Sequence, residues 1–197
     1  MTTPVTARDR AKAERTDAIL LAAAELFGAR GYSGVSLEDI GAAVGISGPA
    51  VYRHFAGKQA LLGALLIGVS EDLVSGGAAV VSGASDDGSP MAALVDFHVD
   101  FALRNADVIR VQDRDLSHLT ADAQDDVRRL QRGYIELWIA TLGTLVDAER
   151  DELRLRVQAC FGLLNSTPHS TSAALRTRAD TARLLAAMAM AALTAVG

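Results

Sequence analysis

The sequence predicts an all-α protein of about nine helices, and two features of its composition lead to that prediction. Ala and Leu are abundant while only four of the 197 residues are Pro, so strong helix formers dominate. Strand-forming residues never cluster into runs that alternate with polar residues, as a half-buried strand requires. Since half of the residues are hydrophobic, the chain can also bury a full apolar core.

The first expected helix follows a polar, basic stretch. Residues 1–15 have no apolar period, and we expect them to form a flexible basic arm. Thr16 or Asp17 then caps a helix with one apolar stripe. Gly31 ends this helix, and Tyr32 can supply the apolar contact that often follows such an end.

Two short helices are expected next. Ser36 starts one of them, with acidic residues in its first turn, and Gly45 ends it after about two turns. Ser47 caps the other, in which Pro49 is tolerated in the first turn. Gly57 separates it from a fourth helix whose leucines again form a stripe.

The rest of the chain is predicted to form further helices. Gly76-Gly77 and residues 82–90 are predicted to form a loop rich in Gly, Ser and Asp, and Ser89-Pro90 starts the fifth helix. Four more helices are expected after a break at Asn105. They cover Ala106–His118, a long segment from Thr120 to about Val146, a segment from Asp147 to before Pro168, and a last one that begins at Thr171 or Ser172.

Several classes of protein are excluded by composition. Cys160 is the only cysteine, which rules out an intramolecular disulfide and a cysteine-based zinc site. No basic segment precedes an apolar one at the N-terminus, so no signal peptide is expected. The longest apolar run, Leu184–Val196, is shorter than the ~20 residues of a spanning helix. We therefore expect a cytoplasmic protein without a membrane partner and without a cofactor.

Charge is distributed unevenly. The net charge is −5, which argues against a protein that coats nucleic acid along its whole surface. Through Leu62 the chain carries seven basic and six acidic residues, whereas the remainder carries twelve and eighteen. A nearly neutral N-terminal part on an acidic body suits local contact with DNA by a few placed cations.

Three short helices, with a Gly-containing turn between the second and third, form a helix-turn-helix pattern. The stretch from Arg15 to Leu62 resembles the DNA-binding domain of TetR-family repressors in an ordered set of short motifs. These are Ala22-x-x-Leu26-Phe27, Gly31-Tyr32, Ser36-x-x-Asp39-Ile40, Val44-Gly45-Ile46-Ser47 and Val51-Tyr52-Arg53-His54-Phe55-x-x-Lys58-x-x-Leu61-Leu62. The resemblance covers about a quarter of the chain. Beyond it, only length and helical character are similar to the family.

The resemblance implies a DNA-binding role at nine positions. Ser36, Ser47, Tyr52, His54 and Lys58 match positions that usually contact phosphates, and their side chains can all donate to phosphate oxygens. The base-reading face of the third helix is implied for Gly48, Pro49, Ala50 and Arg53, of which only Arg53 can bind a guanine edge with two hydrogen bonds. In the arm, Arg8, Arg10 and Lys12 either remain solvated or contact DNA.

Alternatives remain for some of these positions. Tyr52 can be a core residue instead of a DNA contact, and His54 an ordinary surface histidine, whereas Phe55 is assigned to the core. Gly41 departs from the family pattern, which usually has Ala there, but its small size still lets two helices approach. Pro49 also departs from it, and with few polar groups nearby we expect DNA shape and thymine methyl contacts to contribute to recognition.

The C-terminal part is expected to hold a ligand pocket. Residues 61–197 are assigned to ligand binding and dimerisation, and residues 16–60 to the helix-turn-helix domain. A pocket for a small hydrophobic or acyl-type effector needs apolar walls with a few polar groups. The candidates are Phe97, His98, Phe101, Leu116, Tyr134, Trp138, Phe161 and Asn165. For any one of them an ordinary core position is the alternative, and for His98 a satisfied core histidine.

The last two helices are expected to form a homodimer interface. The run Leu184–Leu193 is apolar around much of its circumference, so its own core and a partner should each cover one side. A symmetric dimer would place two recognition helices ~34–36 Å apart on a pseudo-palindromic operator in double-stranded DNA. An effector that favours a state with misplaced recognition helices would weaken DNA binding through linkage, and we expect the fourth helix to pivot.

Two other functions were weighed. One is a DNA-binding protein without an effector, which would have no pocket. The other is a small helical enzyme, suggested by Asp113, Asp115 and His118, of which the last two have a spacing that metal sites use. No further ligand accompanies them, no phosphate-binding loop or nucleophile elbow is present, and Cys160 lies in an apolar stretch typical of inert packing. The prediction is therefore a ligand-responsive repressor and no enzyme.

Overall fold

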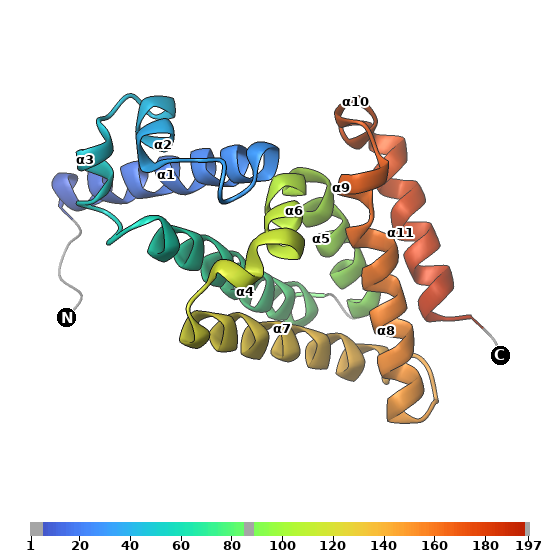
Figure 1. Cartoon of the computed structure of the whole chain (residues 1–197). Helices are drawn as coiled ribbons and strands as arrows, with labels where there is room; N and C mark the ends of the chain where they lie inside the picture. Colours follow the sequence, from blue (N-terminus) through green and yellow to red (C-terminus); the bar gives the residue numbers. More distant parts are fainter. Residues whose placement is uncertain (1–5, 85–88, 196–197) are drawn as a thin grey trace.

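A computed structural model describes residues 6–84 and 89–195, and these residues form helices and no strand. The N-terminal part consists of α1 (Ala7–Arg30), α2 (Leu37–Ala43) and α3 (Gly48–Val51), and α4 (Lys58–Ser82) leads out of it. The remaining helices are α5 (Pro90–Arg104), α6 (Ala106–Asp115), the 3-10 turn η1 (Leu116–His118), α7 (Ala121–Leu142), α8 (Arg150–Asn165), α9 (Thr167–Ser170), α10 (Ala173–Arg176) and α11 (Ala179–Leu193). Figure 1 shows α1–α3 at one end and α8 and α11 at the other. The predicted all-α class is confirmed.

Helix α1 begins ten or eleven residues earlier than the sequence predicted, since its cap is Thr6 and not Thr16 or Asp17. Its start is a capping box in which the Thr6 hydroxyl accepts from the Asp9 amide at 3.2 Å and Asp9 Oδ2 accepts from the Thr6 amide at 3.2 Å. The expectation of a flexible arm is thus wrong from residue 6 onward, while residues 1–5 lie outside the described part. The early turns are exposed, so they leave no apolar period in the sequence.

Most other helix boundaries follow their sequence signals. Gly31 has a φ of 79° and its amide donates to the Phe27 carbonyl, and the Tyr32 ring lies 5.5 Å from that of Phe27. The caps predicted at Ser36, Ser89 and Thr120 all accept from a backbone amide in the first turn of their helix. Ser47 occupies the capping position of α3, but its hydroxyl makes no capping hydrogen bond.

The loop predicted at Gly76-Gly77 is wrong, because both residues lie within α4. Their lack of a side chain serves packing. A Cβ atom on Gly76 would lie 2.5 Å from the Phe97 ring, and one on Gly77 would lie 2.7 Å from the Tyr134 ring. The remainder of the predicted loop, which begins at Ser82, includes residues 85–88 outside the described part.

Helix α4 contributes to both apolar cores of the molecule. Its first half, with Leu61, Leu62 and Leu66, packs with residues of α1–α3 and with residues of α6 and α7. Its second half contacts the core formed by α5, α7, α8 and α11. By length and composition, α4 is the one helix of the described residues that could cross a membrane, but it runs between α5 and α7 inside this fold (Figure 1).

The C-terminal boundaries differ from the prediction in detail. Helix α7 ends at Leu142 and α8 begins only at Arg150, with Glu149 at its capping position. Pro168 lies, buried together with Thr167, in the short helix α9, which the sequence did not predict. The expected last helix is two, since Ser172 caps the single turn α10 and α11 starts afresh at Ala179.

The packing at Gly77 leads to a stability prediction. Gly77→Ala should destabilise the protein by about 1 kcal/mol, because overpacking against Tyr134, Leu137 and Leu94 costs about 1–3 kcal/mol and exceeds the gain in helix propensity of about 1 kcal/mol. Gly68→Ala in the same helix is the matched control, since nothing lies within 4 Å of its added methyl group. Urea unfolding should show a higher midpoint for the Gly68 variant and a lower one for the Gly77 variant.

Candidate nucleic-acid interface and ligand cavity

The turn between α2 and α3 depends on close backbone approach. The Gly41 carbonyl accepts from the Ile46 amide at 2.9 Å, and a Cβ atom on Gly41 would lie 2.8 Å from the Ile46 carbonyl oxygen. Gly45 adopts a φ of 70°, a conformation that favours glycine. A Cβ atom on Gly48 would lie 3.0 Å from the Glu38 side chain. The expectation that Gly41 lets two helices approach is confirmed.

Helix α1 holds α2 and α3 in place through polar contacts. Arg15 donates to the Val44 carbonyl at the end of α2, at 3.1 Å. The Thr16 hydroxyl and Nδ1 of His54 lie 3.0 Å apart, which ties α1 to the segment after α3. These contacts, together with the apolar core below them, give α3 the support that a helix of one turn needs.

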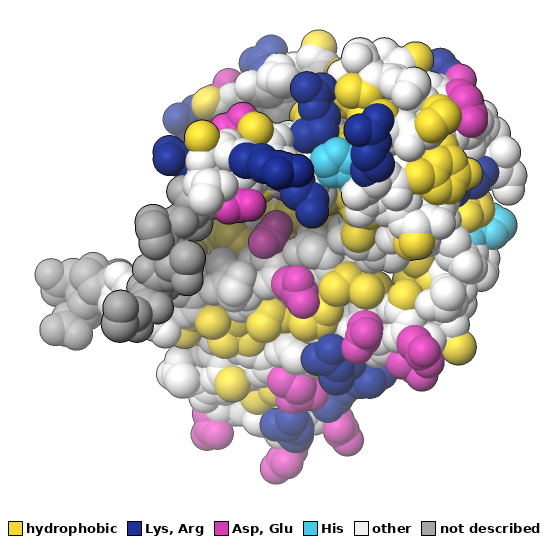
Figure 2. Space-filling model, turned by 90° about the vertical axis from the view of Figure 1, so that its left-hand side faces the viewer, with side chains coloured by type: hydrophobic (Ala, Val, Ile, Leu, Met, Phe, Trp, Pro, Cys, Tyr) yellow, Lys and Arg dark blue, Asp and Glu magenta, His cyan; other side chains and the backbone are white. Residues whose placement is uncertain are grey.

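Helix α3 and the residues after it have a buried and an exposed side. Val51 and Phe55 are buried in the core, as predicted for Phe55. Tyr52 is 57% exposed and Arg53 is also exposed. Figure 2 shows this end of the molecule, with Lys and Arg side chains gathered in its upper half, where α1–α3 lie, and many Asp and Glu side chains below. Tyr52 is therefore a surface residue rather than a core residue.

The nine predicted DNA-contact positions lie close together, from the start of α2 to the start of α4. Ser47 and Pro49 are exposed, Ala50 is half-buried, and Gly48 is buried against Glu38. Three of the polar side chains also have partners within the protein. Ser36 is hydrogen-bonded to Asp39 and His54 to Thr16. Lys58 donates to the carbonyls of Tyr32 and Val35 at 2.9 and 2.8 Å. Their contacts to phosphates remain predictions.

A second site is a cavity of about 210 Å³ within the C-terminal part. Four of the eight predicted pocket residues line it: His98, Tyr134, Phe161 and Asn165. The sequence did not single out the other lining residues, which come from three different helices and carry no shared motif: Ser70, Leu73, Gln112, Leu130, Gln131 and Ile135. The walls are apolar with a few amide and hydroxyl groups, as is typical of small-molecule sites.

The other four predicted pocket residues lie elsewhere. Trp138 is fully buried and packs behind the cavity, 4.8 Å from the Phe161 ring. Phe97 and Phe101 line a separate hollow between α4 and α5, and Leu116 packs against the core shared with α1–α3. The apolar and aromatic residues of α5 therefore face two different hollows, and their spacing in the sequence does not show which residue faces which.

His98 lies at the centre of a hydrogen-bonded chain in the cavity wall. Its Nε2 lies 3.1 Å from Asn165 Oδ1, and its Nδ1 lies 3.3 Å from the Tyr134 hydroxyl. With the proton on Nε2, His98 donates to Asn165 and accepts from Tyr134. Burial lowers the pKa of His98 to about 4 and raises the pKa of the Tyr134 hydroxyl. Both groups are thus neutral at physiological pH, which suits an uncharged part of a ligand.

Helix α6 connects the cavity with α1. Gln112 lines the cavity, and two residues later the Arg114 guanidinium donates to the Phe27 carbonyl in the last turns of α1. The buried Asp115 carboxylate accepts from the Tyr32 amide at 3.3 Å and pairs with Arg114 at 3.0 Å. A Cβ atom on Gly28 would lie 2.7 Å from Asp107. The contact between α1 and α6 is therefore both close and polar.

The residues that suggested an enzyme do not converge. Asp113 pairs with His169 at 3.0 Å, Asp115 is bound to Tyr32 and Arg114, and the His118 ring stacks on Tyr32 with centroids 4.6 Å apart. In residues 6–84 and 89–195, no cluster of three or more His, Cys, Asp or Glu side chains could hold a metal ion. Burial raises the pKa of Cys160 to about 11, so its thiol is poorly reactive.

Comparison with known proteins identifies the N-terminal domain. The family described as bacterial regulatory proteins, tetR family, matches residues 19–65, which contain α2, α3 and most of the core beneath them. Residues 19–65 thus form a TetR-family domain. The HTH-type transcriptional repressor KstR2 of Rhodococcus jostii is 26% identical over 168 residues, which cover 85% of this chain and 82% of the relative.

Solved TetR-family structures share the fold along most of the chain. A regulator from Bordetella parapertussis has a TM-score of 0.80 at 23% identity and covers 92% of this chain and 94% of its own. AibR, solved with isovaleryl coenzyme A and operator DNA, has a TM-score of 0.71 at 19% identity over 91% of this chain and 97% of its own. These likenesses extend to the fold, while the match to the tetR family of bacterial regulatory proteins at residues 19–65 identifies the part of the chain that holds α2 and α3 as a regulator's domain.

Burial of His98 predicts a loss of stability in acid. Its pKa is near 6.5 in the unfolded chain and about 4 in the folded protein, so the unfolded state gains a proton first as the pH falls. The free energy of unfolding therefore has its full value above about pH 6.5. It falls by about 3 kcal/mol between about pH 6.5 and 4. Urea unfolding at pH 7 and pH 4 should show that His98→Gln loses about that much less than the wild type. Equal losses in both proteins would contradict the neutral, buried histidine.

Proposed function

We propose that this TetR-family regulator is a repressor that binds a pseudo-palindromic operator as a homodimer and is released by a small acyl-type effector. The observation that carries the DNA-binding part is the arrangement of α3. Val51 and Phe55 anchor it in the core, while Tyr52 and Arg53 remain exposed beside it. A repressor, rather than an activator, is supported by the name of the relative KstR2. Operator DNA as the partner implies a cytoplasmic protein.

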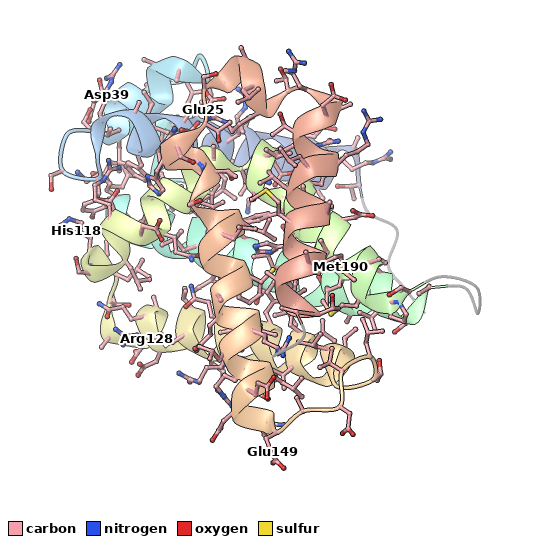
Figure 3. All side chains as sticks on the ribbon, turned by 90° about the vertical axis from the view of Figure 1, so that its right-hand side faces the viewer. Glu25, Asp39, His118, Arg128, Glu149 and Met190 are labelled. Carbon is pink, nitrogen blue, oxygen red and sulfur yellow. The ribbon has the colours of Figure 1, made fainter. Side chains whose placement is uncertain are left out.

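The homodimer is proposed through α8 and α11, which correspond to the last two helices that the sequence predicts. Figure 3 views the face on which α8 and α11 lie side by side, and the two helices are in contact. Leu155 on α8 is 66% exposed, and Leu184 and Met188, one turn apart on α11, are 61% and 44% exposed. Large exposed apolar side chains on adjacent helices support an interface. Sedimentation that gives only monomers at micromolar concentration would contradict it.

The proposed effector carries a short acyl group. The cavity of about 210 Å³ has room for about seven atoms of the size of a water molecule, which is less than a long fatty chain requires. Its lining includes the neutral pair His98–Asn165, in which the Asn165 amide nitrogen can donate a hydrogen bond to a carbonyl group. The complex of AibR with isovaleryl coenzyme A gives a precedent on the same fold.

A ligand bound in the cavity would change the position of α3 through two helices. Ser70 and Leu73 on α4 and Gln112 on α6 line the cavity. Helix α4 continues into the core beneath α3, and α6 is bound to α1 through Arg114. A ligand that shifts either helix would therefore reorient the helix-turn-helix domain, with a coupling of about 1–3 kcal/mol. The pivot of α4 is part of this proposal, and liganded and ligand-free crystals with α4 in one position would contradict it.

Arg53→Ala should weaken operator binding by about 1–3 kcal/mol and relax the preference at one base pair, because this exposed side chain is proposed to contact a base edge. The measurement is a gel shift at stated salt with DNA from upstream of the protein's own gene, together with single-base operator variants. Arg128→Ala is the control, since this exposed arginine lies on α7. Unchanged affinity and base preference for Arg53→Ala would refute the assigned role.

Short-chain acyl-CoAs should stabilise the protein and release it from DNA. At one hundred times Kd the stabilisation is about 2.7 kcal/mol, a rise in Tm of about 5–10 °C for a chain of this size. Leu130→Trp should abolish both effects by filling the cavity, while Leu145→Trp, on an exposed residue, should leave them intact. A thermal-shift series from four-carbon to eighteen-carbon acyl chains tests this. No response to any of them, or a preference for the longest, would sink the short-acyl proposal.

A further inference from the structure

The start of α1 lies beside the segment that follows α3, and together they form a groove. Arg8, Lys12 and Arg15 from α1 line this groove of about 700 Å³ together with Arg53 and His54. The only acidic residue in its lining is Asp9. Four permanent cations facing one open surface give this groove a strongly positive local charge on a protein whose net charge is −5.

We infer that this groove binds the phosphate backbone of the operator next to the site read by α3, so that the start of α1 also contacts DNA. Duplex DNA is the fitting partner because Arg53 belongs both to the groove and to the predicted base-reading face, so a duplex contacted by α3 continues directly into the groove. The inference rests on the proposed DNA-binding function of α3 and extends it to residues 8–15, which lie before the family match at residues 19–65.

The helical form of this segment determines which cations face the groove. At about 100° per residue, positions 8, 12 and 15 fall on one side of a helix. Arg10 is rotated by about 200° from Arg8 and lies on the opposite side, and it does not line the groove. A flexible arm could bring all of these cations to DNA, whereas this helix presents one set and turns Arg10 away.

Local hydrogen bonds hold the groove in shape and do not neutralise its cations. Asp9 is occupied by the capping box with Thr6, and these hydrogen bonds lower the pKa of its carboxyl group. One guanidinium nitrogen of Arg15 donates a hydrogen bond to the Val44 carbonyl, and Nδ1 of His54 contacts the Thr16 hydroxyl. From Thr16 to Ala7 the helix extends by about 14 Å, the rise of about four base pairs of duplex. The groove is thus prearranged along a surface long enough to meet several phosphates.

The test measures operator affinity of the full-length protein as a function of salt. Each lost phosphate contact lowers the slope of log K against log salt by about 0.9. Arg8→Ala combined with Lys12→Ala should therefore reduce the slope by about 2, so that raising salt from 50 to 200 mM costs this variant about twelvefold less affinity than the wild type. Base preference should not change, since phosphate contacts carry no sequence information.

Arg10→Ala is the matched control because it removes a charge from the same helix on the opposite face. It should leave the slope unchanged, and Arg8→Lys with Lys12→Arg should restore the wild-type slope. Circular dichroism verifies that each variant is folded. An unchanged slope in the double variant, or a loss per charge as large in Arg10→Ala, would overturn the inference. Failure of the wild type to bind any operator would instead refute the proposed function itself.

Discussion

The structure depends on one constraint, which is that a single helix is part of both apolar cores. The leucines in the first half of α4 are buried beneath α2 and α3, and its second half packs into the core of the C-terminal helices. Residues of α6 and α7, such as Val111 and Val127, complete the first core from the other side. The helix-turn-helix domain is therefore not an independent unit tied on by a linker, and a displacement of α4 changes the packing on both sides.

Polar contacts complement this shared core at the junction of α1 with α6. Asp115 is buried at the start of the segment that leads to His118, and its partners are the Tyr32 amide and Arg114. Loss of both contacts would leave a buried carboxylate without compensation, which is costly. The junction can therefore adopt few arrangements. A regulator that switches between two states requires contacts of this kind, which have distinct alternatives and do not deform continuously. Apolar packing through α4 and polar contacts through α6 form two parallel connections between cavity and DNA face.

Features set by local interactions were predictable from the sequence, and features set by distant contacts were not. The caps at Ser36, Ser89 and Thr120 involve only neighbouring residues, as does the glycine end of α1 at Gly31, and all were predicted. The capping box at Thr6 is equally local but was missed, because the exposed turns that follow it carry no apolar stripe. Gly76 and Gly77 resembled a loop since their packing partners lie on other helices, 17 or more residues away in the sequence. Six of the ten residues that line the cavity were missed for the same reason.

The single tryptophan has a consequence of its own. Trp138 is fully buried, and its ring lies within 6.1 Å of those of His98, Tyr134 and Phe161, the three aromatic residues that line the cavity. Its indole Nε1 has no hydrogen-bond partner among the described residues. Indole emission is sensitive to nearby polar groups and to water. The regulator thus contains an intrinsic fluorophore at the wall of its own cavity, which can report binding in solution without any attached dye.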